Sequence, residues 1–160
     1  MSEKFAILFP GQGSQSVGML ADLLASSTVV QNTFAEASAA LGYDLAALVL
    51  NGPEENLNQT DKTQPALLTS SVAIYRHWLA QGGAKPAVLA GHSLGEYSAL
   101  VCAGVLSLAD AVVLVEKRGQ YMQLAVPAGT GSMAAVIGLA DDLVAQACQT
   151  AAQGDVVAPV

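Results

Sequence analysis

The chain has 160 residues, of which 52% are hydrophobic and 12% charged, and its formal net charge is −7. This length is enough for one sizeable core and part of a second, and no uninterrupted apolar stretch reaches the roughly 18 residues of a membrane-spanning helix. Nucleic acid is excluded as the expected partner, because binding phosphates requires clustered Lys and Arg and the chain has only six. Residues 1–5 show no signal-peptide pattern, so we expect a cytoplasmic protein with no membrane partner.

The hydrophobic periodicity predicts an α/β chain in two parts. The expected strands span residues 4–9, 86–90, 132–137 and 156 onward. The expected helices span residues 17–25, 29–41, 54–57, 65–80, 94–103, 107–126 and 141–152. Residues 127–131 are a Pro- and Gly-rich linker, and the strand-helix-strand series after them predicts the beginning of a second, smaller subdomain. We therefore place a large subdomain at residues 1–127 and a small one at residues 128–160.

Residues Gly91-His92-Ser93-Leu94-Gly95 match the G-x-S-x-G pattern of a nucleophile elbow, a sharp strand-to-helix turn with a serine at its apex. An apolar run precedes the pentapeptide and a helical pattern follows it. The flanking glycines allow strained dihedral angles and a close approach of the helix to the strand. Ser93 is therefore the candidate nucleophile for acyl transfer, and the N–H of Leu94 should point at the position of an oxyanion.

A second glycine-containing loop, Gly11-Gln12-Gly13-Ser14-Gln15, follows the first expected strand. It does not match a dinucleotide-binding fingerprint, because Ser16 stands where the third glycine belongs. The carboxyl ends of parallel strands gather at one edge of a sheet, so Gln12 and Ser93 are expected to meet there. Cys102 and Cys148 lie in apolar helical patterns without metal-ligand spacing, which predicts no metal site.

A serine nucleophile needs a general base, and the chain has two histidines, His77 and His92. Neither follows Ser93, where the α/β-hydrolase chain order would place the base. His92 should leave the strand on the face opposite to Ser93, and His77 is more typical of a surface or partly packed helical residue. Arg118 lies in a cation-poor helix, where it is either a solvated surface residue or the ligand of a substrate carboxylate.

Four motifs together resemble the family of malonyl-CoA:acyl carrier protein transacylases of bacterial fatty-acid synthesis. They are Phe9-Pro10-Gly11-Gln12-Gly13-Ser14-Gln15, Thr63-Gln64-Pro65-Ala66, Gly91-His92-Ser93-Leu94-Gly95-Glu96-Tyr97 and Arg118-Gly119. The resemblance implies an α/β-hydrolase-like parallel sheet with an inserted ferredoxin-like subdomain. It also implies that Ser93 accepts malonyl from malonyl-CoA and passes it to the phosphopantetheine thiol of acyl carrier protein, with no cofactor.

The resemblance further implies roles for four residues besides the nucleophile. Backbone N–H groups of Gln12 and Leu94 would form the oxyanion hole, Arg118 would hold the malonyl carboxylate, and Gln64 would lie near the site.

The likeness covers only about the first half of a family member, and the family's catalytic histidine has no counterpart in residues 1–160. We therefore expect the histidine to come from a missing C-terminal half or from a second chain, and both subdomains to be incomplete here. Removing the base of a serine nucleophile typically costs on the order of 10⁶ in turnover, so residues 1–160 alone should be nearly inactive. The alternatives are a serine thioesterase or esterase, and a catalytically incomplete fragment that only docks carrier protein.

Overall fold

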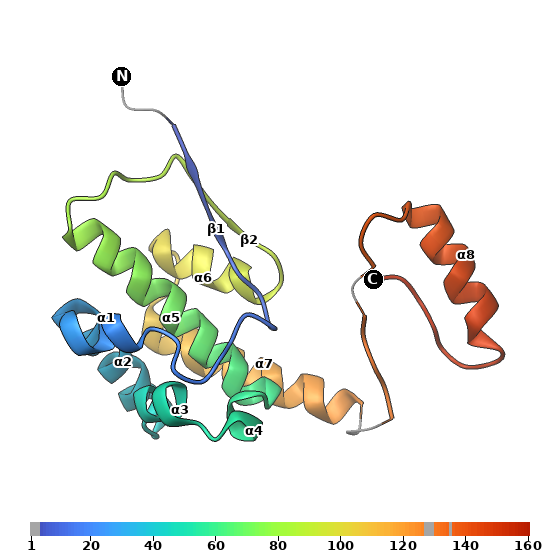
Figure 1. The fold of residues 1–160 in the computed structure, drawn as a ribbon, viewed down its shortest axis with the longest axis horizontal. Helices are drawn as coiled ribbons and strands as arrows, with labels where there is room; N and C mark the ends of the chain where they lie inside the picture. The colour runs from blue at the N-terminus through green and yellow to red at the C-terminus, as the bar shows by residue number, and fades with distance from the viewer. Residues whose placement is uncertain (1–3, 127–129, 135) are drawn as a thin grey trace. The chain divides into compact units, whose positions relative to one another are not determined.

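A computed structural model describes residues 4–126, 130–134 and 136–160 of the protein (Figure 1). The chain divides into two compact units, Met1–Val126 and Pro127–Val160. Within the described residues the structure is mixed α/β, with a small parallel sheet and many helices. No single helix in the described part of the chain is long and apolar enough to cross a membrane, although by length and composition alone one pair, bent by 115°, meets that criterion.

The first unit contains two parallel strands, β1 (Ala6–Phe9) and β2 (Val88–Gly91). Its helices are α1 (Ala21–Ser26), α2 (Thr28–Leu41), α3 (Leu45–Asn51), α4 (Glu54–Leu57), α5 (Thr60–Ala80), α6 (Leu94–Cys102) and α7 (Leu108–Ala125). The strand register pairs Phe9 with Gly91, so both strands end at the same level. The loops that follow the two strands therefore leave the same edge of the sheet, as expected for Gln12 and Ser93.

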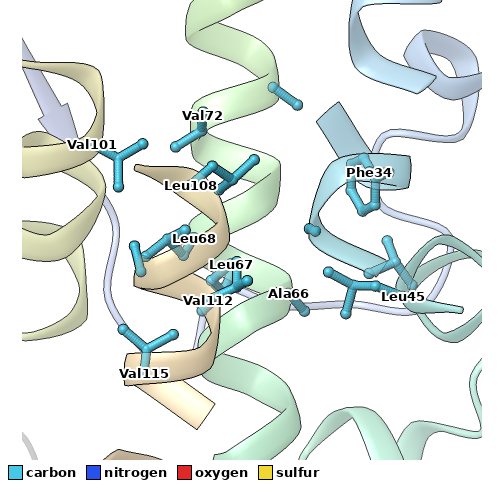
Figure 2. Packing of buried hydrophobic residues seen from close by; sticks show 14 of the residues in the cluster. Phe34, Leu45, Ala66, Leu67, Leu68, Val72, Val101, Leu108, Val112 and Val115 are labelled. Carbon is cyan, nitrogen blue, oxygen red and sulfur yellow. The ribbon is translucent and has the colours of Figure 1, made fainter. Parts of the chain in front are cut away.

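Helix α5 is the centre of the first unit and packs against α2, α6 and α7 (Figures 1 and 2). Every residue from Thr63 to Ala73 is buried, which is typical of a helix enclosed on all sides. Apolar side chains of the neighbouring helices complete this core, among them Phe34, Leu45, Leu108, Val112 and Val115. The packing fixes α7 beside α5, and this contact carries Arg118 to the end of β2.

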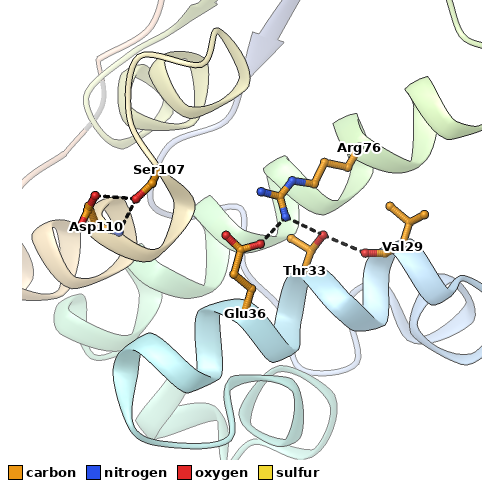
Figure 3. Close-up of polar contacts among 6 residues, drawn as sticks. All are labelled: Val29, Thr33, Glu36, Arg76, Ser107 and Asp110. Carbon is orange, nitrogen blue, oxygen red and sulfur yellow. Dashed lines mark hydrogen bonds and ion pairs between the residues drawn. The ribbon is translucent and has the colours of Figure 1, made fainter.

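Polar contacts cap one of these helices and join two others (Figure 3). The Oγ of Ser107 accepts the N–H of Asp110 at 3.0 Å and donates to its Oδ2 at 2.6 Å. Ser107 thus caps α7 as the sequence predicts, although the Asp110 carboxylate bonds the serine hydroxyl rather than a backbone N–H. Arg76 of α5 donates to Glu36 of α2 at 2.6 Å.

The structure differs from the helix predictions in the first unit in three places. The helix expected from residue 17 begins at Ala21, because Gly18 and Leu20 have φ angles of 85° and 61° that no α-helix accommodates. Helix α5 begins at Thr60 rather than Pro65, since the N–H groups of Lys62 and Thr63 already bond the carbonyl of Gln59. Pro65 lies in the second turn of α5, where it cannot donate the hydrogen bond that an N–H would give to the carbonyl of Asp61, and the burial of the helix from Thr63 to Ala73 compensates for this loss.

The third difference is α3, which the sequence analysis does not anticipate. Asp44 caps it by accepting the N–H of Ala47 at 2.8 Å, and Leu45 and Val49 are buried. A helix of 7 residues is too short to show clear periodicity, so its packing decides its formation.

The second unit contains helix α8 (Asp141–Ala152), with the bounds that the sequence predicts. The strands expected at residues 132–137 and from 156 onward are wrong, because no described residue of either segment is in a strand; residue 135 lies outside the described residues. An extended segment becomes a strand only when a neighbour supplies its hydrogen bonds, and β1 and β2 are the only paired strands in the described chain. Residues 127–129 of the expected linker also lie outside the described residues.

Candidate active site

Ser93 lies on the turn between β2 and α6, with its side chain exposed. Its φ of 55° and ψ of −110° are a strained combination for a residue with a side chain. Such strain costs on the order of 1–3 kcal/mol and persists only where the surroundings enforce it. The geometry is that of a nucleophile elbow, which projects the hydroxyl away from its own backbone.

Two glycines make this turn possible through close backbone contacts. A Cβ atom at Gly91 would lie 2.2 Å from the carbonyl carbon of Gly95. A Cβ atom at Gly95 would lie 2.3 Å from the carbonyl oxygen of Phe9. Helix α6 therefore starts in direct backbone contact with the ends of both strands, and a side chain at either glycine would displace it.

The loop after β1 lies against this turn and is held on its other side by the start of α5. The Gln12 side chain donates to Thr60 Oγ1 at 3.2 Å, and the Gln15 side chain donates to Asn58 Oδ1 at 2.8 Å. Gln15 also accepts the N–H of Gly13 at 2.9 Å. Among the described residues, no acceptor bonds the backbone N–H of Gln12 or of Leu94.

Arg118 connects α7 to the nucleophile. Its Nη2 donates to Ser93 Oγ at 2.9 Å, and its Nη1 donates to Gln64 Oε1 at 2.8 Å. The guanidinium carbon lies 5.7 Å from the centre of the Tyr97 ring, within the range of a cation–π contact. Gln64 is fully buried and donates from Nε2 to Met122 Sδ at 3.3 Å. The structure thus brings Ser93, Arg118 and Gln64 together, as the resemblance implies.

Comparison with known proteins identifies the family to which this chain belongs. The sequence profile of the acyl transferase domain family matches residues 6–160. The chain belongs to the acyl transferase domain family. A malonyl CoA-acyl carrier protein transacylase of Escherichia coli strain K12 is 68% identical over 157 residues, which cover 98% of this acyl transferase chain and 51% of that relative.

Solved structures give the same picture. An acyl carrier protein S-malonyltransferase from Vibrio cholerae is 68% identical with a TM-score of 0.88, over 95% of this chain and 50% of that one. A malonyl-transacylase solved in complex with a type II PKS acyl-carrier protein is 60% identical with a TM-score of 0.93, over 99% of this chain and 51% of that one. The acyl transferase chain thus spans about half the length of the relatives it matches.

Within the described residues, neither histidine of this acyl transferase chain forms a hydrogen bond with the Ser93 hydroxyl. His77 Nδ1 forms a hydrogen bond of 2.9 Å with Ser27 Oγ, and its half-buried position agrees with the prediction of a partly packed helical residue. His92 is exposed. Burial raises the pKa of Cys102 to about 12, so this thiol stays protonated at neutral pH and is no alternative nucleophile.

The described part of the acyl transferase chain holds no group of three or more His, Cys, Asp or Glu side chains that fits a metal ion. An apolar cavity of about 460 Å³ lies along β1 and α5 and is lined by residues such as Ile7, Ile74 and Trp78. Neither Ser93 nor Arg118 lines this cavity, so the candidate site is the open turn itself.

The sequence analysis gives no role to three residues that contact the site, Thr60, Tyr97 and Met122. Tyr97 lies four residues after Ser93, on the same face of α6. Met122 lies four residues after Arg118, so helical spacing was an available signal for both. No local signal identifies Thr60, because its partner Gln12 is 48 residues away.

Proposed function

We propose that the protein transfers a malonyl group from malonyl-CoA to the phosphopantetheine thiol of acyl carrier protein through a malonyl-serine at Ser93. The observation that carries this proposal is the 2.9 Å contact between the Arg118 guanidinium and Ser93 Oγ. A single methylene separates the reacting carbonyl of malonyl from its free carboxylate. A cation beside the nucleophile is therefore placed to bind that carboxylate while the carbonyl is attacked.

The reaction has two displacement steps at Ser93. In the first, Oγ attacks the thioester carbonyl, its proton goes to a base, and the C–S bond breaks to release the coenzyme A thiol. In the second, the carrier thiol attacks the new ester, and the C–O bond to Ser93 breaks. The acyl group leaves on sulfur and the serine regains its proton, so the transfer uses no cofactor.

The tetrahedral intermediates of both steps carry a negative charge on oxygen. The backbone N–H groups of Gln12 and Leu94 form the oxyanion hole in this proposal. Their free hydrogen-bonding capacity and the close approach of Gly95 to the backbone of Phe9 and Pro10 support the assignment. Gln64 orients Arg118 through the bond from Nη1 to Oε1.

A neutral histidine outside residues 1–160 supplies the base, either from the part of the relatives that this chain does not span or from a second chain. The large subdomain, residues 1–127, belongs to an α/β-hydrolase-like sheet, and residues 128–160 begin an inserted ferredoxin-like subdomain. We place the enzyme in the cytoplasm. These subdomain identities rest on the sequence motifs.

Incubation with malonyl-CoA, followed by mass spectrometry of the peptide containing Ser93, tests the proposal. We expect a malonyl adduct on Ser93 that disappears when acyl carrier protein bearing phosphopantetheine is added and that never forms in Ser93→Ala. Loss of the adduct to water at the same rate without carrier protein would instead identify a thioesterase. Absence of any adduct in the natural-length protein would reduce the chain to a docking fragment.

A further inference from the structure

The contact between α5 and α7 beside the active site depends on the absence of a side chain at Gly119. A Cβ atom there would lie 2.5 Å from Asp61 Cα, 2.7 Å from Asp61 N and 2.7 Å from Thr60 O. All three are backbone atoms of the first turn of α5, so no change of rotamer relieves the overlap. Because carbon atoms pack at about 3.5–4.0 Å, any other residue would separate the helices by roughly 1 Å.

The same short stretch of interface holds the arginine. Arg118 precedes Gly119 and bonds Gln64, which lies on α5 one turn beyond Asp61. Near the glycine contact, Lys62 Nζ lies 2.8 Å from Glu116 Oε1, and the two side chains are 27% and 16% exposed. An ion pair, a glycine contact and a hydrogen bond therefore fix α7 on α5 within one turn of Arg118.

This arrangement links helix spacing to the position of the guanidinium. The bond from Arg118 Nη2 to Ser93 Oγ is 2.9 Å long, and a hydrogen bond is lost beyond about 3.5 Å. The bond to Gln64 crosses the same interface, so it lengthens too when α7 moves away from α5. We propose that Gly119 is a positioning residue that sets the acyl selectivity of Ser93 by fixing the distance of Arg118 from the bound acyl group.

This inference rests on the proposed malonyl transfer, and Gly119→Ala in the natural-length protein tests it. The readout is the ratio of the initial rates of Ser93 acylation by malonyl-CoA and by acetyl-CoA. Acetyl has no carboxylate, so a weakened charge-assisted hydrogen bond from Arg118 affects only malonyl-CoA. We therefore expect the ratio to fall about tenfold. Gln120→Ala, an exposed neighbour on the same helix, is the matched control and should leave the ratio unchanged.

A double-variant cycle with Arg118→Ala separates positioning from a general structural effect. In the Arg118→Ala background, Gly119→Ala should cause no further fall of the ratio. The melting temperature of Gly119→Ala should also fall, whereas glycine-to-alanine exchange within an unobstructed helix stabilises the helix.

Each outcome decides the inference. A ratio equal to that of the wild type, or an equal fall in both backgrounds, overturns the positioning role. If Gly119→Ala does not fold, Glu116→Gln is tested in its place, because it loosens the same interface without adding atoms. A fall of the ratio that is absent in the Arg118→Ala background supports the positioning role, and an unchanged ratio overturns it. A wild type that does not prefer malonyl-CoA to acetyl-CoA would instead overturn the proposed function.

Discussion

Arg118 and Ser93 are 25 residues apart in the chain, yet the Nη2 of the arginine donates to the Oγ of the serine at 2.9 Å. The arginine comes from α7 and the serine from the turn between β2 and α6. Helix α5 packs against both α6 and α7. The position of the cation thus depends on the core as well as on local sequence.

The first prediction concerns the shape of the cation at position 118. In Arg118→Lys the charge is kept, but a single ammonium group cannot bond Gln64 and the acyl carboxylate in the planar geometry of a guanidinium. We expect the rate of Ser93 acylation by malonyl-CoA to fall by roughly tenfold or more, with little change for acetyl-CoA. In Arg118→Met, which has no charge at this position, the rate of acylation by malonyl-CoA should fall further. Equal losses of rate with malonyl-CoA and acetyl-CoA would contradict the role of Arg118 as a carboxylate ligand.

The second prediction concerns the elbow. In Gly95→Ala the added methyl group meets the carbonyl oxygen of Phe9, so we expect a loss of up to about 3 kcal/mol in the free energy of unfolding, the usual cost of overpacking. Gly11→Ala is the control, because a Cβ there lies at an ordinary 3.5 Å from His92 O. Urea denaturation of both variants measures the difference, and similar midpoints would show that the close contact is not strictly required.

The third prediction compares the core with a surface ion pair. Leu68 is fully buried among the side chains of Figure 2, so Leu68→Ala should reduce the free energy of unfolding by about 2–5 kcal/mol. Glu36→Gln breaks the contact with Arg76, but both side chains are more than a third exposed, and we expect less than about 1 kcal/mol. Chemical denaturation measures the loss in the free energy of unfolding for both variants. A larger loss in Glu36→Gln than in Leu68→Ala would show that the ion pair, and not the core, holds α2 against α5.

The fourth prediction is a pH dependence that comes from Cys102. Burial raises its pKa from the ordinary value of 9.0 to about 12, an effect only partly offset by Arg76. Between these two values the unfolded thiol ionises while the folded one keeps its proton, so stability is full below pH 9 and declines as pH rises towards 12. Between pH 8 and pH 10.5, the free energy of unfolding should therefore fall more in the wild type than in Cys102→Ala. Parallel profiles of the two proteins in urea denaturation would contradict the raised pKa.

Local sequence was sufficient wherever neighbouring residues supply the structural cause. The elbow at Ser93, the cap at Ser107 and the bounds of α8 follow from glycine spacing, a capping side chain and periodicity, and the structure has all three. The register of Phe9 with Gly91 also agrees with the expected meeting of two strand ends at one edge.

Tertiary structure decided what depends on partners far away in the chain. The short α3 forms on a buried face, and the segments at residues 132–137 and from 156 onward are not strands in the described chain, because a strand exists only beside another. For Arg118, no feature of the sequence distinguishes a solvated surface cation from a member of the site. Its bonds to Ser93 and Gln64, 25 and 54 residues away, select the second, because only the packing of α7 on α5 brings these side chains within bonding distance.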